Sequence, residues 1–189
     1  MNDTLQVLGL SGSLRQKSYN TALLRAAAQL APADITITIY DLRAIPFYNE
    51  DIRVENDFPD AVEDLRQRIR MADGLLFASP EYNASITGVL KNAIDWASRQ
   101  PDSPLMGKPV GLIGASMGGF GTVRGQAHLR DVCHGTGMLA MSRPEIMISR
   151  VQEHIDDHGT LIQEQTKQQL QTFVSALAHW VRRLQTQNC

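Results

Sequence analysis

The sequence predicts an α/β fold in which a parallel β-sheet lies between two layers of helices. Four short apolar runs bounded by turn residues have the length and composition of buried parallel strands. Between them, and after the last, lie longer runs whose apolar residues recur every three or four positions, as in amphipathic helices. Strands and helices that alternate in this way favour a three-layer sandwich.

The four clear strands are Val7–Leu10, Ile35–Tyr40, Gly74–Ser79 and Val110–Ala115. A fifth strand is expected within Met138–Ile148, where Pro144 interrupts the apolar run. Because proline donates no hydrogen bond to a neighbouring strand, it is tolerated at the edge of a sheet. The fifth strand is therefore predicted to lie at an edge.

Five helices are predicted between and after these strands. The first runs over residues 21–30, and the fourth from about residue 122 to about residue 135. The second, third and last are indicated by apolar stripes, which are Val62, Leu65, Ile69 and Ala72, then Val89, Leu90, Ala93, Ile94 and Ala97, and finally Leu170, Phe173, Val174, Leu177, Val181 and Leu184. Asp57 and Pro59 are typical start signals for the second helix.

Length and composition predict one cytoplasmic domain over residues 1–189, long enough to bury a substantial core. The formal net charge of -2 argues against nucleic acid and anionic membranes as partners. No apolar run approaches the length of a membrane span, and residues 1–4 lack the basic region of a secretory signal. With only Cys133 and Cys189 and no CxxC motif, a reducing compartment is expected.

The loop after the first predicted strand has the composition of an anion-binding site. Ser11-Gly12-Ser13-Leu14-Arg15 follows that strand, and Ser18 and Asn20 stand just before the first predicted helix. Free N–H groups and the helix dipole attract negative charge to the beginning of a helix. Serine hydroxyls add donors, and the Arg15 guanidinium matches the geometry of a phosphate. We therefore expect this loop to bind a phosphorylated small molecule.

Two common phosphate motifs are absent from this loop. No lysine stands where G-x-x-x-x-G-K-[ST] requires one, and Gly9 and Gly12 lack the spacing of G-x-G-x-x-G. A loop rich in serine suits a terminal monophosphate, whereas a pyrophosphate requires the close backbone approach that glycine permits. Helix capping alone would explain Ser18 or Asn20 but not the whole set.

Two further loops carry residues suited to binding a planar heteroaromatic group. Ser79-Pro80-Glu81-Tyr82-Asn83-Ala84-Ser85-Ile86 follows the third strand, and Ser116-Met117-Gly118-Gly119-Phe120-Gly121 follows the fourth. Each alone also fits an ordinary turn. In a parallel sheet, however, all three loops lie at the carboxyl ends of the strands, where ligands bind. A phosphate site, a flat wall and an amide-lined edge together indicate a site for flavin mononucleotide (FMN).

At these residues the chain resembles the NADPH-dependent FMN reductases with a flavodoxin-like fold, particularly their quinone, chromate and azo-dye reductase branch. The resemblance rests on residues 9–15 with Ser18 and Asn20, on Pro80–Asn83 with Ile86 and Gly88, and on Ser116–Gly119. Residues 91–96, Lys-Asn-Ala-Ile-Asp-Trp, extend the second block. The family's fold implies a five-stranded parallel sheet with strand order 2-1-3-4-5.

The resemblance also implies a role for each block. The residues expected to hold the FMN phosphate are Ser11, Ser13, Arg15, Ser18 and Asn20, and Thr21 is expected to bind the cofactor with them. The residues expected to flank the isoalloxazine ring are Pro80, Glu81, Tyr82, Asn83 and Ile86. Those expected at its pyrimidine edge are Ser116, Met117, Gly118 and Gly119, with backbone N–H groups of 117–119 stabilising negative charge.

The implied activity is that of an oxidoreductase in which FMN carries the chemistry and no protein side chain is catalytic. NADPH or NADH would supply the hydride, and a small-molecule acceptor would then take the electrons in a ping-pong scheme. Quinones are the expected acceptors, with chromate, azo or nitro compounds and free flavin also possible. The resemblance further implies a homodimer or homotetramer, with the helix over 88–97 as a contact unless Trp96 belongs to the core. No metal ion is expected.

Three other interpretations are weaker. Ser116 lies in a G-x-S-x-G motif between a strand and a helix, as in a serine hydrolase, although the chain is short for one and the other loops would then have no role. A flavodoxin-like electron carrier without enzymatic activity is usually more acidic. His154 and His158 have the spacing of two metal ligands on a helix, but a solvated turn fits them better. Arg124 fits either a coenzyme phosphate or solvent.

Overall fold

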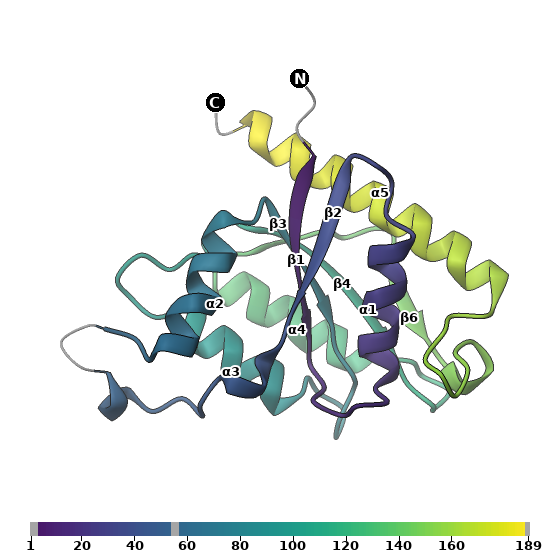
Figure 1. The fold of residues 1–189 in the computed structure, drawn as a ribbon, viewed down its shortest axis with the longest axis horizontal. Helices are drawn as coiled ribbons and strands as arrows, with labels where there is room; N and C mark the ends of the chain where they lie inside the picture. Colours follow the sequence, from purple (N-terminus) through teal and green to yellow (C-terminus); the bar gives the residue numbers. More distant parts are fainter. Residues whose placement is uncertain (1–3, 54–56, 188–189) are drawn as a thin grey trace.

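The computed structural model describes residues 4–53 and 57–187, and it contains a parallel sheet with the order β2-β1-β3-β4-β5 (Figure 1). The strands are β1 (Leu5–Ser11), β2 (Ile35–Tyr40), β3 (Gly74–Ala78), β4 (Pro109–Ala115), β5 (Leu139–Ala140) and β6 (Ile146–Ile148). The predicted fold class and strand order are confirmed. The sequence features at residues 1–3 and at Cys189 lie outside the described residues.

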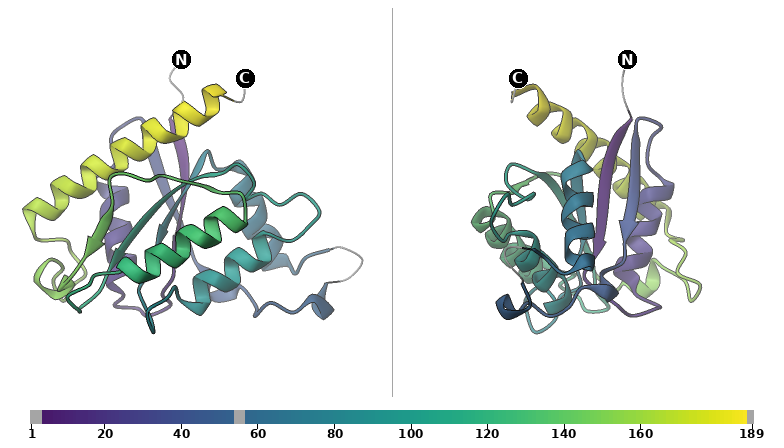
Figure 2. Two further views of the ribbon diagram at one scale, coloured as in Figure 1. Left: turned by 180° about the vertical axis from the view of Figure 1, so that it is seen from behind. Right: turned by 60° about the vertical axis from the view of Figure 1, so that its left-hand side comes forward.

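Helices cover both faces of the sheet, as two views of the ribbon show (Figure 2). They are α1 (Tyr19–Gln29), α2 (Asp60–Met71), α3 (Gly88–Ala97), α4 (Val123–Gly135) and α5 (Glu164–Gln187). On one face α1 and α5 pack against alternate strand residues such as Val7 and Ile113. On the other face α2, α3 and α4 pack against residues such as Leu8 and Leu112. The three-layer sandwich thus encloses two apolar cores.

The fifth position in the sheet differs from the prediction because two short strands occupy it. β5 pairs with the beginning of β4, and β6 pairs with the end of β4, in both cases in parallel. Pro144 lies between them, following a cis peptide bond. The edge position predicted from this proline is confirmed, but the strand is interrupted rather than continuous.

The direction of the strands places the three candidate loops together. All strand pairs are parallel, so the loops after β1, β3 and β4 emerge at one end of the sheet. The beginning of β1 and the end of α5 lie at the opposite end (Figure 1). No helix among residues 4–53 and 57–187 is long and apolar enough to cross a membrane. That residues 1–189 form one domain remains a prediction.

A buried arginine fastens the end of α3 to α2. The Arg66 side chain is fully buried, and its two terminal nitrogens donate to five backbone carbonyl oxygens between residues 96 and 102, at 2.8 to 3.4 Å. Its guanidinium carbon also lies 3.9 Å from the centre of the Phe58 ring. Carbonyls at the end of a helix need donors, and Arg66 supplies them where water has little access.

We expect Arg66→Met to lower the free energy of unfolding by about 3 kcal/mol or more, because several buried carbonyls lose their donor. Urea denaturation followed by circular dichroism measures this loss. The control is Arg68→Met on the same helix, where an exposed ion pair to Asp64 at 3.3 Å should contribute less than about 1 kcal/mol. Equal losses in the two variants would contradict the role of Arg66.

Candidate functional site

The loops after β1, β3 and β4 enclose a cavity of about 240 Å³ at the carboxyl end of the sheet, here called the loop cavity. Its lining includes nine residues singled out from the sequence, which are Ser13, Arg15, Ser18, Asn20, Pro80, Glu81, Tyr82, Ser116 and Met117. The other six lie outside its lining. Ser11 and Thr21 line a neighbouring cavity, and Asn83, Ile86, Gly118 and Gly119 lie elsewhere on the loops.

The first turn of α1 offers unpaired N–H donors to the loop cavity. Ser18 caps the helix by accepting from the Thr21 N–H at 3.2 Å. The N–H groups of Tyr19 and Asn20 donate to no acceptor among residues 4–53 and 57–187, and both residues line the cavity. Such donors at the positive end of a helix suit a phosphate. This end of the cavity therefore fits the terminal phosphate of FMN.

The polar side chains of the first loop are held by local hydrogen bonds. Ser11 Oγ and Thr21 Oγ1 lie 2.7 Å apart and share a hydrogen bond. Ser13 Oγ accepts from the Arg15 N–H at 3.3 Å. The Arg15 guanidinium donates to the Lys17 carbonyl and lies 5.4 Å from the centre of the Tyr19 ring. The Arg15 charge is thus kept beside the beginning of α1.

Asn20 joins the first loop to the fourth strand. Its Nδ2 donates to the Ala115 carbonyl at 2.8 Å, and its Oδ1 accepts from the Ala115 N–H at 2.9 Å. The Asn20 side chain is buried. These bonds leave one N–H of the amide for a ligand. Most of the hydrogen-bonding capacity of Asn20 therefore positions α1 against the end of β4.

A second bond joins the first loop to the beginning of α3. Thr87 Oγ1 donates to the Gly12 carbonyl at 2.7 Å. The approach is so close that a Cβ atom at residue 12 would lie 2.8 Å from Thr87 Oγ1 and 3.3 Å from Pro80 Cδ. Glycine at position 12 is needed for this contact.

Glu81 joins the loop after β3 to α4. One carboxylate oxygen accepts from the N–H groups of Arg124 and Gly125, each at 2.9 Å, and the other accepts from Arg124 Nε at 2.7 Å. Burial alone would raise the pKa of Glu81, but the Gly125 N–H and the Arg124 guanidinium outweigh it, and the pKa is lowered. Glu81 is ionised at neutral pH and caps the helix.

The chain beyond Glu81 turns back sharply and presents an exposed tyrosine ring. The backbones of Tyr82 and Ser85 exchange two hydrogen bonds of 3.0 Å, and Asn83 and Ala84 between them both have positive φ. This is the pattern of a tight hairpin turn. His128 on α4 holds the turn through a bond of 3.0 Å between Nδ1 and Ser85 Oγ. Tyr82 is 54 % exposed beside the cavity.

The loop after β4 offers a second set of free N–H groups. The Ser116 N–H donates to the Ile148 carbonyl at 2.9 Å, and the carbonyls of Ser116 and Gly118 accept from Val151 and Arg150. The N–H groups of residues 117–119 donate to no acceptor among the residues that the structure describes. The loop is therefore anchored by the Ser116 N–H and by two carbonyls, while the N–H groups of residues 117–119 remain for a ligand.

The structure does not support a hydrolase or a histidine metal site. The only bond recorded for Ser116 Oγ within the described chain is a long one of 3.5 Å to the Gly118 carbonyl. His154 Nδ1 instead bonds Thr166 Oγ1 at 2.8 Å. Residues 156–160 form a turn rather than a helix. No group of three potential metal ligands occurs in residues 4–53 or 57–187.

Burial raises the pKa of Cys133 to about 12, so its thiol stays protonated.

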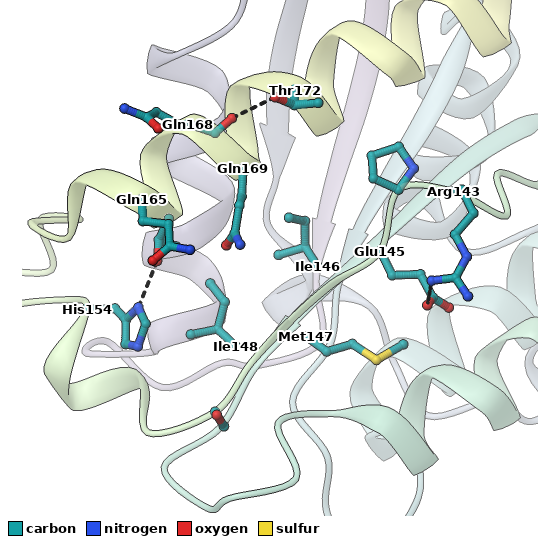
Figure 3. A pocket seen from close by; sticks show the side chains of 13 residues that line it. Arg143, Glu145, Ile146, Met147, Ile148, His154, Gln165, Gln168, Gln169 and Thr172 are labelled. Atoms are coloured by element: carbon teal, nitrogen blue, oxygen red, sulfur yellow. Dashed lines mark hydrogen bonds and ion pairs between the residues drawn. The ribbon is translucent and has the colours of Figure 1, made fainter.

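A larger cavity, of about 660 Å³, lies elsewhere, between β6 and the beginning of α5 (Figure 3). Ile146 and Ile148 lie across it from Gln169, and Arg143 pairs with Glu145 at its rim. None of the residues singled out for the flavin site lines it. The loop cavity, although smaller, is lined by residues of all three candidate loops.

The model of the NADPH-dependent FMN reductase family matches residues 5–153 of this chain. This chain belongs to the NADPH-dependent FMN reductase family. It is 50% identical over 184 residues to an NAD(P)H-dependent FMN reductase of Pseudomonas aeruginosa, covering 97% of this chain and 99% of the relative. A quinone reductase of Escherichia coli K12 is 40% identical over 186 residues, with 97% and 99% covered.

Among solved structures, a flavoenzyme NAD(P)H:(acceptor) oxidoreductase from Paracoccus denitrificans superposes with a TM-score of 0.86. The two chains are 35% identical, and the match covers 95% of this chain and 98% of that one. The family match includes all three loops of the cavity, and α5 lies beyond it. The chain is thus an oxidoreductase of a family that uses FMN and NAD(P)H, as the sequence predicted.

Sequence reasoning missed the bonds that join the loops. It assigned Glu81 to the surroundings of the isoalloxazine ring, and it left open whether Arg124 contacts a coenzyme phosphate or only solvent. In the structure the two side chains form an ion pair with each other. One signal was available, because a cation in the first turn of a helix opposes the helix dipole and calls for a nearby anion. No comparable signal marked the partner of Asn20 or of Thr87.

We expect Glu81→Gln to lower the free energy of unfolding by about 1–3 kcal/mol at neutral pH, because the bonds to α4 lose their charge. The lowered pKa means that this stabilisation is complete above the unfolded-state value of about 4.3 and is lost as pH falls through the lower folded-state value. The difference between wild type and variant should therefore shrink below about pH 4.

Denaturant titrations at several pH values measure this difference. The control is Glu153→Gln, since Glu153 is exposed and should change stability by less than about 0.5 kcal/mol. If the difference in the free energy of unfolding between wild type and Glu81→Gln stays constant from neutral to acidic pH, the carboxylate charge does not stabilise the contact with α4.

Proposed function

We propose that the loop cavity binds FMN and that the protein passes electrons from NADPH or NADH through this FMN to quinones. The observation that carries the proposal is the pairing of two features in one cavity. Unpaired N–H groups at the beginning of α1 lie at one end, and the apolar surfaces of Pro80, Tyr82 and Met117 contribute to its wall. This combination matches a ligand with a phosphate at one end and a flat ring at the other.

In this proposal the phosphate lies against the first loop. Ser13, Arg15 and Ser18 line the cavity there, and the Arg15 guanidinium provides the charge that a phosphate requires. Asn20 contributes chiefly by placing α1, with one amide N–H left to donate. Ser11 and Thr21 support the loop through their shared hydrogen bond rather than by lining the cavity.

The ring would lie between the loops after β3 and β4. When bound, FMN supplies the capacity to accept a hydride and to release the electrons afterwards. Pro80 and Tyr82 would contact the ring, with Asn83 in the turn between Tyr82 and Ser85 and Ile86 directly after that turn. The free N–H groups of Met117, Gly118 and Gly119 would face its pyrimidine edge, where oriented donors stabilise negative charge.

We infer a ping-pong scheme in which nicotinamide coenzyme and acceptor use the same open side of the cavity in turn. Tyr82 and Met117 line the cavity and are 54% and 60% exposed, which leaves their apolar surfaces accessible to an aromatic molecule from solvent. Quinones are favoured as acceptors because two curated relatives are named quinone reductases. Chromate, azo and nitro compounds and free flavin are secondary candidates.

We also propose a homodimer or homotetramer, since the loop after β4 exposes two large apolar side chains, those of Met117 and Phe120. Trp96 takes no part in such a contact, because it is fully buried and its Nε1 donates to the Pro46 carbonyl at 2.8 Å. Analytical ultracentrifugation would measure the state. The cytoplasmic location remains a prediction, supported here by the free, buried thiol of Cys133.

The reductase proposal predicts that the purified protein shows the visible absorption bands of oxidised flavin, or gains them with added FMN. Those bands should bleach when NADPH is added without oxygen and return when a quinone follows. An electron carrier would keep its bands after NADPH alone, and a protein that takes up no FMN would refute the proposal.

We expect the double variant Ser13→Ala, Arg15→Ala to bind FMN more weakly by about 2–4 kcal/mol, because charge-assisted phosphate bonds are lost. Fluorescence titration of the apoprotein with FMN measures the affinity. Gln16→Ala serves as the control, since Gln16 stands in the same loop but does not line the loop cavity. Unchanged affinity in the double variant would remove the phosphate assignment.

A further inference from the structure

A second cavity, of about 420 Å³, lies against the first loop and is here called the arginine cavity. It lies between that loop, α1 and the residues at the end of β2, and it shares Ser13 and Arg15 with the loop cavity. Arg15, Arg25 and Arg43 line it, against a single carboxylate, Asp41. The excess of positive charge indicates an anionic ligand.

Two of these arginines differ in a way that suits a phosphate monoester. Arg43 is fixed, since its Nη1 donates to Asp41 Oδ2 at 2.7 Å and its Nη2 donates to the Leu14 carbonyl at 3.2 Å. Arg25 is exposed on α1, and its side chain has no hydrogen bond or ion pair with any described residue. A fixed guanidinium beside a free one can meet the several oxygens of a phosphate.

The position of the arginine cavity favours a nucleotide. It lies at the carboxyl ends of β1 and β2, the place where dinucleotide-binding α/β sheets hold an adenosine ribose. There an acidic residue after the second strand usually accepts from the ribose 2′-hydroxyl, whereas an arginine accommodates a 2′-phosphate. Here both oxygens of Asp41 already accept from Arg43, one from its N–H at 3.0 Å and one from Nη1. The arrangement therefore suits a 2′-phosphate better than a 2′-hydroxyl.

We propose that the arginine cavity binds the 2′-phosphate end of NADPH, with Arg25 and Arg43 as its ligands. The proposal rests on the proposed function, in which the nicotinamide lies beside the ring in the loop cavity. Ser13 and Arg15 belong to both cavities, so one dinucleotide extends from the first cavity to the second across this loop. The site makes NADPH the preferred coenzyme over NADH.

Binding of adenosine 2′,5′-bisphosphate to the FMN-loaded, oxidised protein tests the site without any turnover. Calorimetry should show that Arg25→Ala weakens this binding about tenfold and that Arg25→Glu weakens it more, because a charge-assisted bond is removed or reversed. Adenosine 5′-monophosphate should bind more weakly than the bisphosphate and be unaffected by either variant. Arg183→Ala, at an exposed arginine on α5, should leave both affinities unchanged.

Steady-state kinetics supply the second measurement. In Arg25→Ala the kcat/KM for NADPH should fall about tenfold, while that for NADH stays within about twofold. Equal losses for both coenzymes, unchanged bisphosphate affinity or equal wild-type affinity for the two adenosine phosphates would each overturn the assignment. A loss of bound FMN in Arg25→Ala would also overturn it, since the residue would then serve the flavin.

Failure of this inference is distinguishable from failure of the proposed function. Bleaching of the flavin bands by NADPH tests the function and does not depend on Arg25. Bisphosphate binding that depends on Arg25 supports the site even in a preparation that shows no bleaching. If NADPH bleaches the flavin bands normally but substitution of Arg25 does not change bisphosphate affinity, the 2′-phosphate site is refuted and the proposed function is not.

Discussion

The two hydrogen bonds between the Asn20 side chain and the Ala115 backbone hold the beginning of α1 against the end of β4. Because these groups are buried, water does not compete for the bonds, and losing one partner would leave the other unsatisfied. The bonds from Thr87 to Gly12 and from Glu81 to α4 complete a closed ring among the three loops. The cavity between them is therefore shaped before a ligand arrives, which lowers the ordering cost of binding.

The hydrophobic pattern predicted most of the fold because helices cover both faces of the central strands. β1, β3 and β4 are buried on both sides and thus read as continuous apolar runs. The fifth position could not be predicted in the same way. β5 has two residues and β6 has three. Strands this short depend on the backbone groups of β4 with which they pair more than on their own sequence.

The meeting of the three loops was predictable, but their internal contacts were not. Parallel strands place successive loops at one end whatever the loops contain. Which side chain then caps which helix depends on distances across the sheet, such as that between Glu81 and Arg124, 43 positions apart in the chain. Likewise, the serines of the first loop were recognisable as donors, but the pairing of Ser11 with Thr21 became visible only in the folded chain.

The side chains that join the loops are different from the apolar side chains that the loop after β4 exposes to solvent. Asn20 and Thr87 are buried, whereas Met117 and Phe120 are mostly exposed and contribute no side chain to the ring of bonds. Substitutions at exposed positions of this kind usually alter stability little. During evolution, homologous proteins can therefore change their ligand specificity through single substitutions at exposed positions, while the buried hydrogen bonds that join the loops are retained.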